Sequence, residues 1–374
     1  MQADLSQAPA VSAVQFGLIM AMCAGSIAVL FYLFQKHIRG ESLLDYEHRW
    51  QVPWGSGIVL AVMLFAFSGV VYSLVQDETE LQGPQVTEPA GAVPVGADKN
   101  HAGQPELPAT RSVPEFVAFG LSTTIIQLTL VGMCALWLRT GCDADFRDLG
   151  LPRDSKEFFA DLRTGFLACL AAFLPIYILQ ITLVLLLQSQ VEHPLVTELR
   201  GGHSLAMMLS ALLVAVIAAP ISEEFFFRLL LQGWLESWED QKIGFSGTTR
   251  IANTTVVTPE SMAGETLAGS AEAVAVTTPD ESNSFLEEPQ FRPAAGYLGF
   301  LPHGWLPIVL SGILFGLAHV GQGVAPVSLV LFGIVLGYLY QRTHRLIPSI
   351  TAHAMFNAYS LVMLWLALEN PASP

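Results

Sequence analysis

Long apolar stretches alternate with short polar segments along most of this chain. Eight of the stretches reach the length of about 17 residues or more at which a helix can cross a membrane. We expect helices over residues 13–35, 54–75, 116–138, 165–188, 204–235, 304–320, 324–341 and 346–368. The fifth stretch is too long for one upright span, and Pro220 within it predicts a kink. The pattern predicts an all-α, polytopic membrane bundle of about eight transmembrane helices.

Composition supports a membrane protein. Of the 374 residues 52% are hydrophobic and 13% are charged, where a soluble domain carries about 25% charged residues. The net charge of −15 lies mostly in two loops and argues against a nucleic-acid partner. The four cysteines show no metal-ligand spacing and are interpreted as core thiols.

Basic residues follow the first apolar stretch at Lys36, Arg39 and Arg49. Short loops rich in Lys and Arg stay on the cytoplasmic side, so we expect the N-terminus outside and, after eight spans, the C-terminus outside as well. The expected location is the cytoplasmic membrane of a bacterium, with the lipid bilayer as the surrounding partner.

The polar segments divide the chain into parts. We expect an N-terminal two-span segment at 1–76, an acidic Pro/Gly-rich loop at 77–113, and the third span with a basic inner loop at 114–159. A core follows at 160–370. It is interrupted at 239–300 by a polar insertion whose many Thr, Ser and Glu residues favour disorder.

Three charged residues interrupt the apolar run "APISEEFFFRLLLQGW" at 219–234. Glu224 and Arg228 are four residues apart, so on a helix they are neighbours and can form an ion pair. Glu223 points in another direction and has no local cation. Buried charges in a membrane are costly and usually functional. The alternative is one static ion-pair cluster that only packs the helix.

Two further polar intrusions lie in later apolar helices. His319 ends an apolar helix in "SGILFGLAHVGQG", and His353 and Asn357 share one helical face in "TAHAMFNAYS". Taken singly, His319 could be a helix-terminus partner, and the other two could join helices by hydrogen bonds.

Depth in the membrane connects these intrusions. If successive helices are antiparallel and rise about 1.5 Å per residue, Glu223 and His319 lie about 18 and 22 Å from the same end. His353 and Asn357 then lie at about 10 and 16 Å. The four side chains fall in one band, which predicts a single buried polar site.

A carboxylate and an imidazole at such a site can hold and deprotonate one water. Asn and a second His can donate to the oxyanion that forms when that water attacks a carbonyl. No serine or cysteine stands beside a histidine in these motifs, so a covalent nucleophile is unsupported. We expect no cofactor. Zinc, with Glu223, His319 and His353 as ligands, is the competing interpretation, although the chain has no H-E-x-x-H motif.

Three ordered motifs resemble those of a known family. "EEFFFR" (Glu223, Glu224, Arg228), "FGLAH" (Phe315, His319) and "HAMFN" (His353, Asn357) resemble the EExxxR, FxxxH and HxxxN motifs of the CPBP, or Abi, family of intramembrane proteases, which includes type II CAAX prenyl endopeptidases. The resemblance covers about 160–370. It implies that Glu223 and His319 activate the water, that His353 and Asn357 line the oxyanion site, and that Glu224, Arg228 and Phe315 support them.

The resemblance implies a membrane endopeptidase acting on a membrane-associated peptide or protein, a lipidated tail being one form of it. The alternative is a non-catalytic membrane scaffold or immunity protein that keeps the polar cluster for binding. A transporter or proton relay would use the same Glu and His, but it would show inverted repeats, and we find no clear repeat.

Overall fold

The computed structural model describes residues 12–47, 52–64, 67, 111–188, 198–199, 204–242 and 304–369, and every labelled element in them is helical. The first half contributes α1 (Ala13–Ile38), α3 (Val113–Gly141) and α4 (Ser155–Leu187), with a further helical stretch at 56–64. One continuous helical run follows, composed of α6 (Leu205–Leu212), η2 (Leu213–Ala218), α7 (Ala219–Glu223), η3 (Glu224–Gln232) and α8 (Gly233–Lys242). The chain ends with α9 (Trp305–Leu317), α10 (Ala325–Thr343) and α11 (Leu346–Glu369).

The predicted all-α membrane class is confirmed. Six helical segments within the described residues are long and apolar enough to cross a membrane. The remaining two expected spans differ from these. Helix α9 has only 13 residues, about 20 Å, and is shorter than the roughly 30 Å apolar layer. Of the stretch expected at 54–75, only 54–64 and residue 67 are described.

The two expected loops fall largely outside the described residues. Residues 77–110 and 243–303 are not described, so disorder in them stays a prediction. Helix α8 continues to Lys242, which places the first four residues of the expected insertion in a helix. On the far side of that insertion, the backbone N–H of Gly304 donates to the buried Glu239 carboxylate at 2.8 Å. The two flanks of the insertion are therefore joined.

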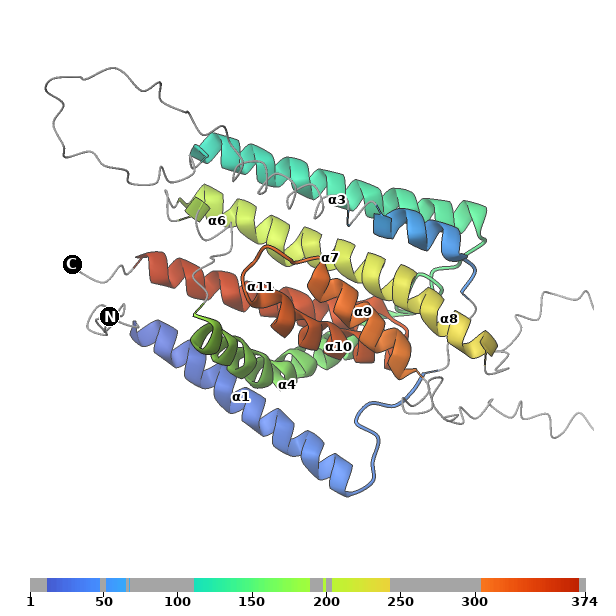
Figure 1. The fold of residues 1–374 in the computed structure, drawn as a ribbon, viewed down its shortest axis with the longest axis horizontal. Helices are drawn as coiled ribbons and strands as arrows, with labels where there is room; N and C mark the ends of the chain where they lie inside the picture. The colour runs from blue at the N-terminus through green and yellow to red at the C-terminus, as the bar shows by residue number, and fades with distance from the viewer. Residues whose placement is uncertain are drawn as a thin grey trace, which may run out of the picture.

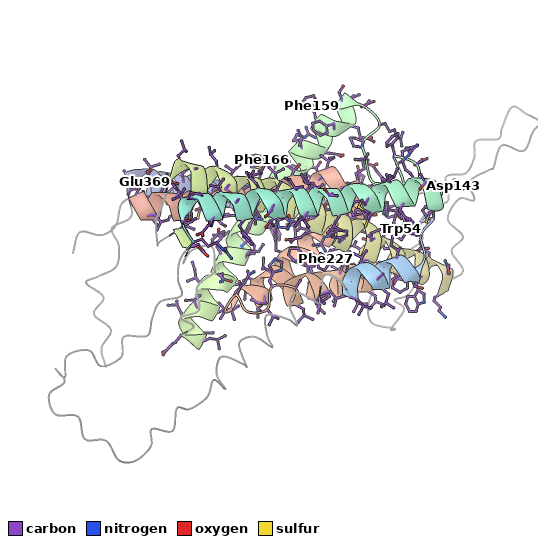
Figure 2. All side chains as sticks on the ribbon, turned by 90° about the horizontal axis from the view of Figure 1, so that it is seen from above. Trp54, Asp143, Phe159, Phe166, Phe227 and Glu369 are labelled. Carbon is purple, nitrogen blue, oxygen red and sulfur yellow. The ribbon has the colours of Figure 1, made fainter. Side chains whose placement is uncertain are left out.

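The helices form a bundle with α9, α10 and α11 at its centre (Figure 1). Helix α3 packs along α6, η2 and α7 on one side, whereas α1 packs against α4 on the other. Helix α4 crosses the other helices steeply, with Phe159 and Phe166 on its outer side (Figure 2). Both side chains are exposed, as expected for a surface that faces lipid.

Small residues allow the central helices to approach closely. A Cβ added to Gly333 of α10 would lie 2.9 Å from Gly312 Cα of α9, and one added to Gly165 of α4 would lie 2.5 Å from Pro348 O of α11. Close packing of backbones replaces the hydrophobic effect as a driving force between helices in lipid. The α9–α10 hairpin therefore depends on glycines at its interface.

Gly316→Ala is expected to lower the free energy of unfolding by about 1–3 kcal/mol, because the new Cβ would lie 2.6 Å from the backbone oxygen of Pro326. The measurement is unfolding of the purified protein in detergent. Gly17→Ala in α1 is the matched control, since nothing lies within 4 Å of a Cβ there. It should be neutral or stabilising by up to about 1 kcal/mol. Equal destabilisation by both variants would contradict the packing argument.

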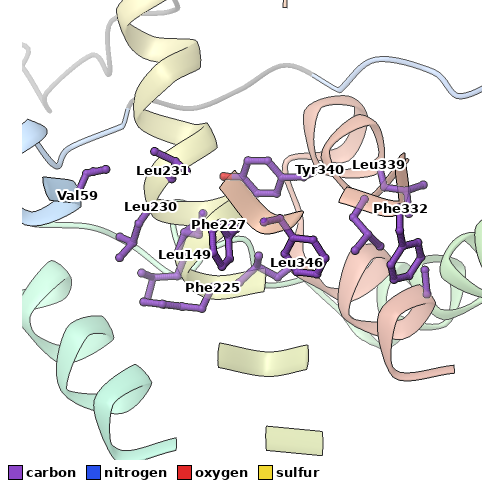
Figure 3. Packing of buried hydrophobic residues seen from close by; sticks show 14 of the residues in the cluster. Val59, Leu149, Phe225, Phe227, Leu230, Leu231, Phe332, Leu339, Tyr340 and Leu346 are labelled. Carbon is purple, nitrogen blue, oxygen red and sulfur yellow. The ribbon is translucent and has the colours of Figure 1, made fainter. Parts of the chain in front are cut away.

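The apolar core lies around the second half of the long helix (Figure 3). Phe225, Phe227 and Leu230 are buried there together with Leu149 and Leu346. The core thus surrounds the part of the helix that carries the Glu-Glu-x-x-x-Arg motif.

A charged cluster fixes where α11 begins. Arg345, in the two-residue connection between α10 and α11, bonds Asp161 at 2.8 Å, Glu157 at 3.2 Å, and Glu47. Asp161 is buried and belongs to α4. Because α11 starts one residue later at Leu346, this cluster sets the depth of His353 and Asn357 in the bundle.

Candidate active site

The long helix that carries Glu223 is π-helical in two stretches, η2 and η3. Pro220 is the second residue of α7, so a π-helical stretch ends two residues before the proline at which a kink is predicted. Backbone carbonyls of η3 also accept hydrogen bonds from side chains of other elements. Trp54 donates to Leu230 O at 3.2 Å, and Ser311 donates to Phe227 O at 3.0 Å.

Glu224 and Arg228 form the ion pair that their spacing predicts. Arg228 Nε donates to Glu224 Oε2 at 2.9 Å, and both side chains are fully buried. Arg228 Nη1 also donates to Ser311 Oγ at 2.7 Å, and its guanidinium carbon lies 5.0 Å from the centre of the Phe315 ring. Arg228 therefore joins η3 to α9 as well as neutralising Glu224.

The second oxygen of Glu224 contacts His353. His353 Nδ1 lies 3.0 Å from Glu224 Oε1, and the rings of Phe315 and Phe332 are edge-on to the imidazole at 5.6 Å each. An ionised carboxylate can only accept, so Nδ1 carries the proton in this bond. Glu224 thus connects Arg228 on its own helix with His353 on α11.

Glu223 lies between the two histidines. Its Oε2 atom is 3.9 Å from His319 Nε2 and 3.8 Å from His353 Nε2. These distances are too long for direct hydrogen bonds but suit a bridging water. The Glu223 side chain is 26% exposed, whereas Glu224 has no exposed surface. Of the two glutamates, Glu223 is therefore the more accessible, although its Oε2 atom is itself buried.

The hydrogen bonds of the two imidazoles determine which nitrogen of each ring carries the proton. His319 Nδ1 lies 2.8 Å from the Phe315 carbonyl oxygen, which can only accept a hydrogen bond. Both Nδ1 atoms therefore carry protons. In the neutral rings both Nε2 atoms are then acceptors on the side of Glu223. Glu223 and the Nε2 atom of a neutral His319 are enough to accept both protons of a water.

The spacing of the same three residues can be compared with that of zinc ligands. Within the described part of the chain no group of three His, Cys, Asp or Glu side chains is placed to hold a metal ion. Neighbouring ligands around a tetrahedral zinc, each about 2.0–2.1 Å from it, lie roughly 3.3 Å apart. Here the nitrogens lie 3.9 and 3.8 Å from Glu223 Oε2, which is longer than that spacing, and the expectation of no cofactor stays a prediction.

Of the residues predicted for the site, the structure brings Glu223, His319 and His353 together around one carboxylate oxygen. Asn357 lies one turn beyond His353 and contacts η2, where its Nδ2 donates to Ala215 O at 2.8 Å. Phe315 contacts both histidine rings, with its centre 5.0 Å from that of His319.

Ser311 and Phe332 also contact the site residues, and the sequence motifs do not include them. A signal for Ser311 was present, because residues 311, 315 and 319 are four apart and share one helical face. A polar stripe that continues from Arg228 along the same helix was also missed. Gln232 donates to Glu236 at 2.9 Å and to Gly337 O at 2.8 Å, joining the long helix to α10.

Fold and site together define an integral, multi-pass helical membrane protein with a buried Glu–His site. Residues 205–269 and 282–359 match the family described as Rce1-like, type II CAAX prenyl endopeptidase. This match confirms the family resemblance predicted from the three motifs. It begins at the first residue of α6 and ends within α11, so it contains every motif residue. It covers less than half of the chain and leaves residues 1–204 unmatched.

The family match also reaches into the polar insertion from both sides, with a break only at 270–281. The family is one of membrane endopeptidases, and hydrolysis is therefore the activity class that the match supports. No curated protein and no solved structure matches the chain.

Proposed function

We propose that this protein is an intramembrane endopeptidase that hydrolyses a peptide bond with a water activated by Glu223 and His319. The observation that carries the proposal is the position of Glu223 Oε2, 3.9 Å from Nε2 of His319 and 3.8 Å from Nε2 of His353, with the His319 nitrogen as an acceptor. A water between these groups has hydrogen-bond acceptors for its protons, and its oxygen lone pairs remain available for attack.

In the proposed first step Glu223 takes one proton from the water, and the water oxygen forms a bond to the peptide carbonyl carbon. The carbonyl oxygen becomes an oxyanion. The remaining proton of the attacking water stays hydrogen-bonded to His319 Nε2. When the tetrahedral intermediate collapses, the C–N bond breaks and the proton held by Glu223 passes to the leaving amine. No covalent bond to the protein forms.

In this proposal His353 and Asn357 stabilise the oxyanion. Because His353 Nδ1–H is used on Glu224, donation from Nε2 requires an imidazolium. Glu224 Oε1 accepts the Nδ1–H bond of that ring and so orients it, much as a buried aspartate orients the histidine of a Ser-His-Asp triad. Asn357 has a second N–H in addition to the one that it donates to Ala215 O.

The proposed substrate is a membrane-associated peptide or protein tail, with a C-terminal lipid as one form of it. The proposed location is the cytoplasmic membrane of a bacterium. The family description supports the prenylated class, and the buried position of the site among apolar helices supports a substrate that reaches it from the membrane surface.

The test is cleavage by the purified protein in proteoliposomes that hold a mixed library of membrane-tethered peptides, with and without C-terminal lipids. We expect wild-type protein to generate new peptide termini in the presence of a strong chelator, and His319→Ala to remain at background. Loss of activity on chelation with restoration by zinc would contradict the metal-free mechanism. No cleavage of any library member would support the scaffold alternative.

A further inference from the structure

The helix register around Pro220 leaves one backbone carbonyl without its usual donors. In η2 the N–H of Ala219 bonds to Val214 O, five residues back, rather than to Ala215 O, four residues back. In that register the next N–H, at position 220, would bond to Ala215 O. Residue 220 is proline and has no N–H. Both regular donors of Ala215 O are therefore excluded, one by the π register and one by the imino acid.

The carbonyl of Ala215 is instead bound by a side chain from α11. Asn357 Nδ2 donates to it at 2.8 Å. An amide group is planar, so one hydrogen bond at Nδ2 restricts the direction of the second N–H as well. Asn357 is one turn beyond His353, and Pro220 is three residues before Glu223. The contact therefore joins the helix that carries the candidate base to the helix that carries the candidate oxyanion donors.

We propose that Pro220 is a positioning residue for Asn357. Because proline has no N–H, Ala215 O can accept the hydrogen bond of the Asn357 amide, and this bond holds the amide beside His353. The catalytic consequence rests on the proposed peptidase function, whereas the contact itself does not. Pro220 is buried and touches no reacting atom in this proposal, so it acts only through the carbonyl.

Unfolding of four proteins tests the contact without reference to activity. These are wild type, Asn357→Leu, Pro220→Ala and the double variant. Asn357→Leu leaves Ala215 O unpaired and should lower Tm by roughly 2–4 °C. In the Pro220→Ala background an N–H is present to bond Ala215 O, so the same substitution should lower Tm by less than half as much. Equal losses in the two backgrounds would overturn the proposal.

Peptidase kinetics test the consequence. Pro220→Ala should lower kcat roughly tenfold to a hundredfold with KM within about twofold, because the second N–H of Asn357 would no longer be held in place. Incorporation of lactic acid at position 220 gives a backbone ester that lacks the N–H without the proline ring. That protein should retain kcat within about threefold, which a purely conformational role of the ring would not allow.

The matched control is Pro175→Ala, at a proline inside α4 that faces outward. It should leave kcat unchanged. If the wild-type protein has no activity but the four proteins show the expected differences in Tm, the proposed function is refuted and the positioning role is kept. Equal loss of kcat in the alanine and lactic acid proteins would refute the positioning role and keep the function.

Discussion

Glu223→Gln is expected to abolish peptide hydrolysis and to leave the protein at least as stable as wild type. Glutamine has nearly the shape of glutamate but cannot take a proton from water. A general base contributes about 10²–10⁴-fold, and an amide in its place also removes the charge that orients the water, so we expect kcat to fall by roughly 10³-fold or more. The measurement is single-turnover cleavage in proteoliposomes.

The Tm of Glu223→Gln distinguishes a reacting carboxylate from a structural one. Glu223 Oε2 is buried and has no hydrogen-bond partner, and its nearest ring nitrogens are 3.8 and 3.9 Å away. Removal of an uncompensated charge from a low-dielectric site relieves a desolvation cost, so Tm should stay the same or rise. A large fall in Tm would indicate that Glu223 belongs to the static ion-pair network.

Glu236→Gln is the matched control for Glu223→Gln. Glu236 is also a buried carboxylate on the long helix, but it contacts Gln232 and His344 and not the candidate site. We expect its kcat to stay within about threefold of wild type. Loss of activity in both variants to the same extent would show that any neutralised acid in this helix inactivates the protein, and it would remove the case for Glu223 as base.

Contacts within a helix follow from residue spacing, whereas contacts between helices do not. The spacing of Glu224 and Arg228 predicts their ion pair, because side chains four residues apart are neighbours on any helix, and the pair is present at 2.9 Å. Depth counting places His319 and His353 in one band with Glu223, and all three meet. Spacing cannot give a partner on another helix. The second contact of Glu224, with His353, was therefore not predicted from the sequence.

The π-helical stretches could not be predicted from the pattern of apolar residues. A π-helical turn changes which backbone groups pair, and it does so without a residue type of its own. Pro220 predicted a kink, but not that Ala215 O would accept a hydrogen bond from Asn357. Hydrogen bonds from side chains to backbone carbonyls, such as that from Trp54 to Leu230 O, likewise cannot be predicted from a hydropathy pattern.

Arg228→Met is expected to destabilise the protein more than Gly316→Ala, Pro220→Ala or Asn357→Leu. It would leave the fully buried Glu224 carboxylate without its guanidinium and would remove the bond to Ser311 Oγ. Breaking a buried ion pair by removing one partner costs about 3–5 kcal/mol, because the remaining charge stays uncompensated. Thermal unfolding in detergent should show this loss, and activity should fall with it, because Glu224 also holds His353.

The double variant Glu224→Gln/Arg228→Met tests whether the uncompensated Glu224 charge causes the destabilisation by Arg228→Met. It removes both charges, so it should be less destabilised than Arg228→Met alone. The exposed pair Arg39–Glu41 gives the matched control: its atoms are only 2.6 Å apart, but the side chains are 52% and 46% exposed. Arg39→Met should cost no more than about 1 kcal/mol, since solvent screens such pairs. If the double variant were as unstable as the sum of its single variants, loss of packing by the arginine side chain would replace charge burial as the explanation.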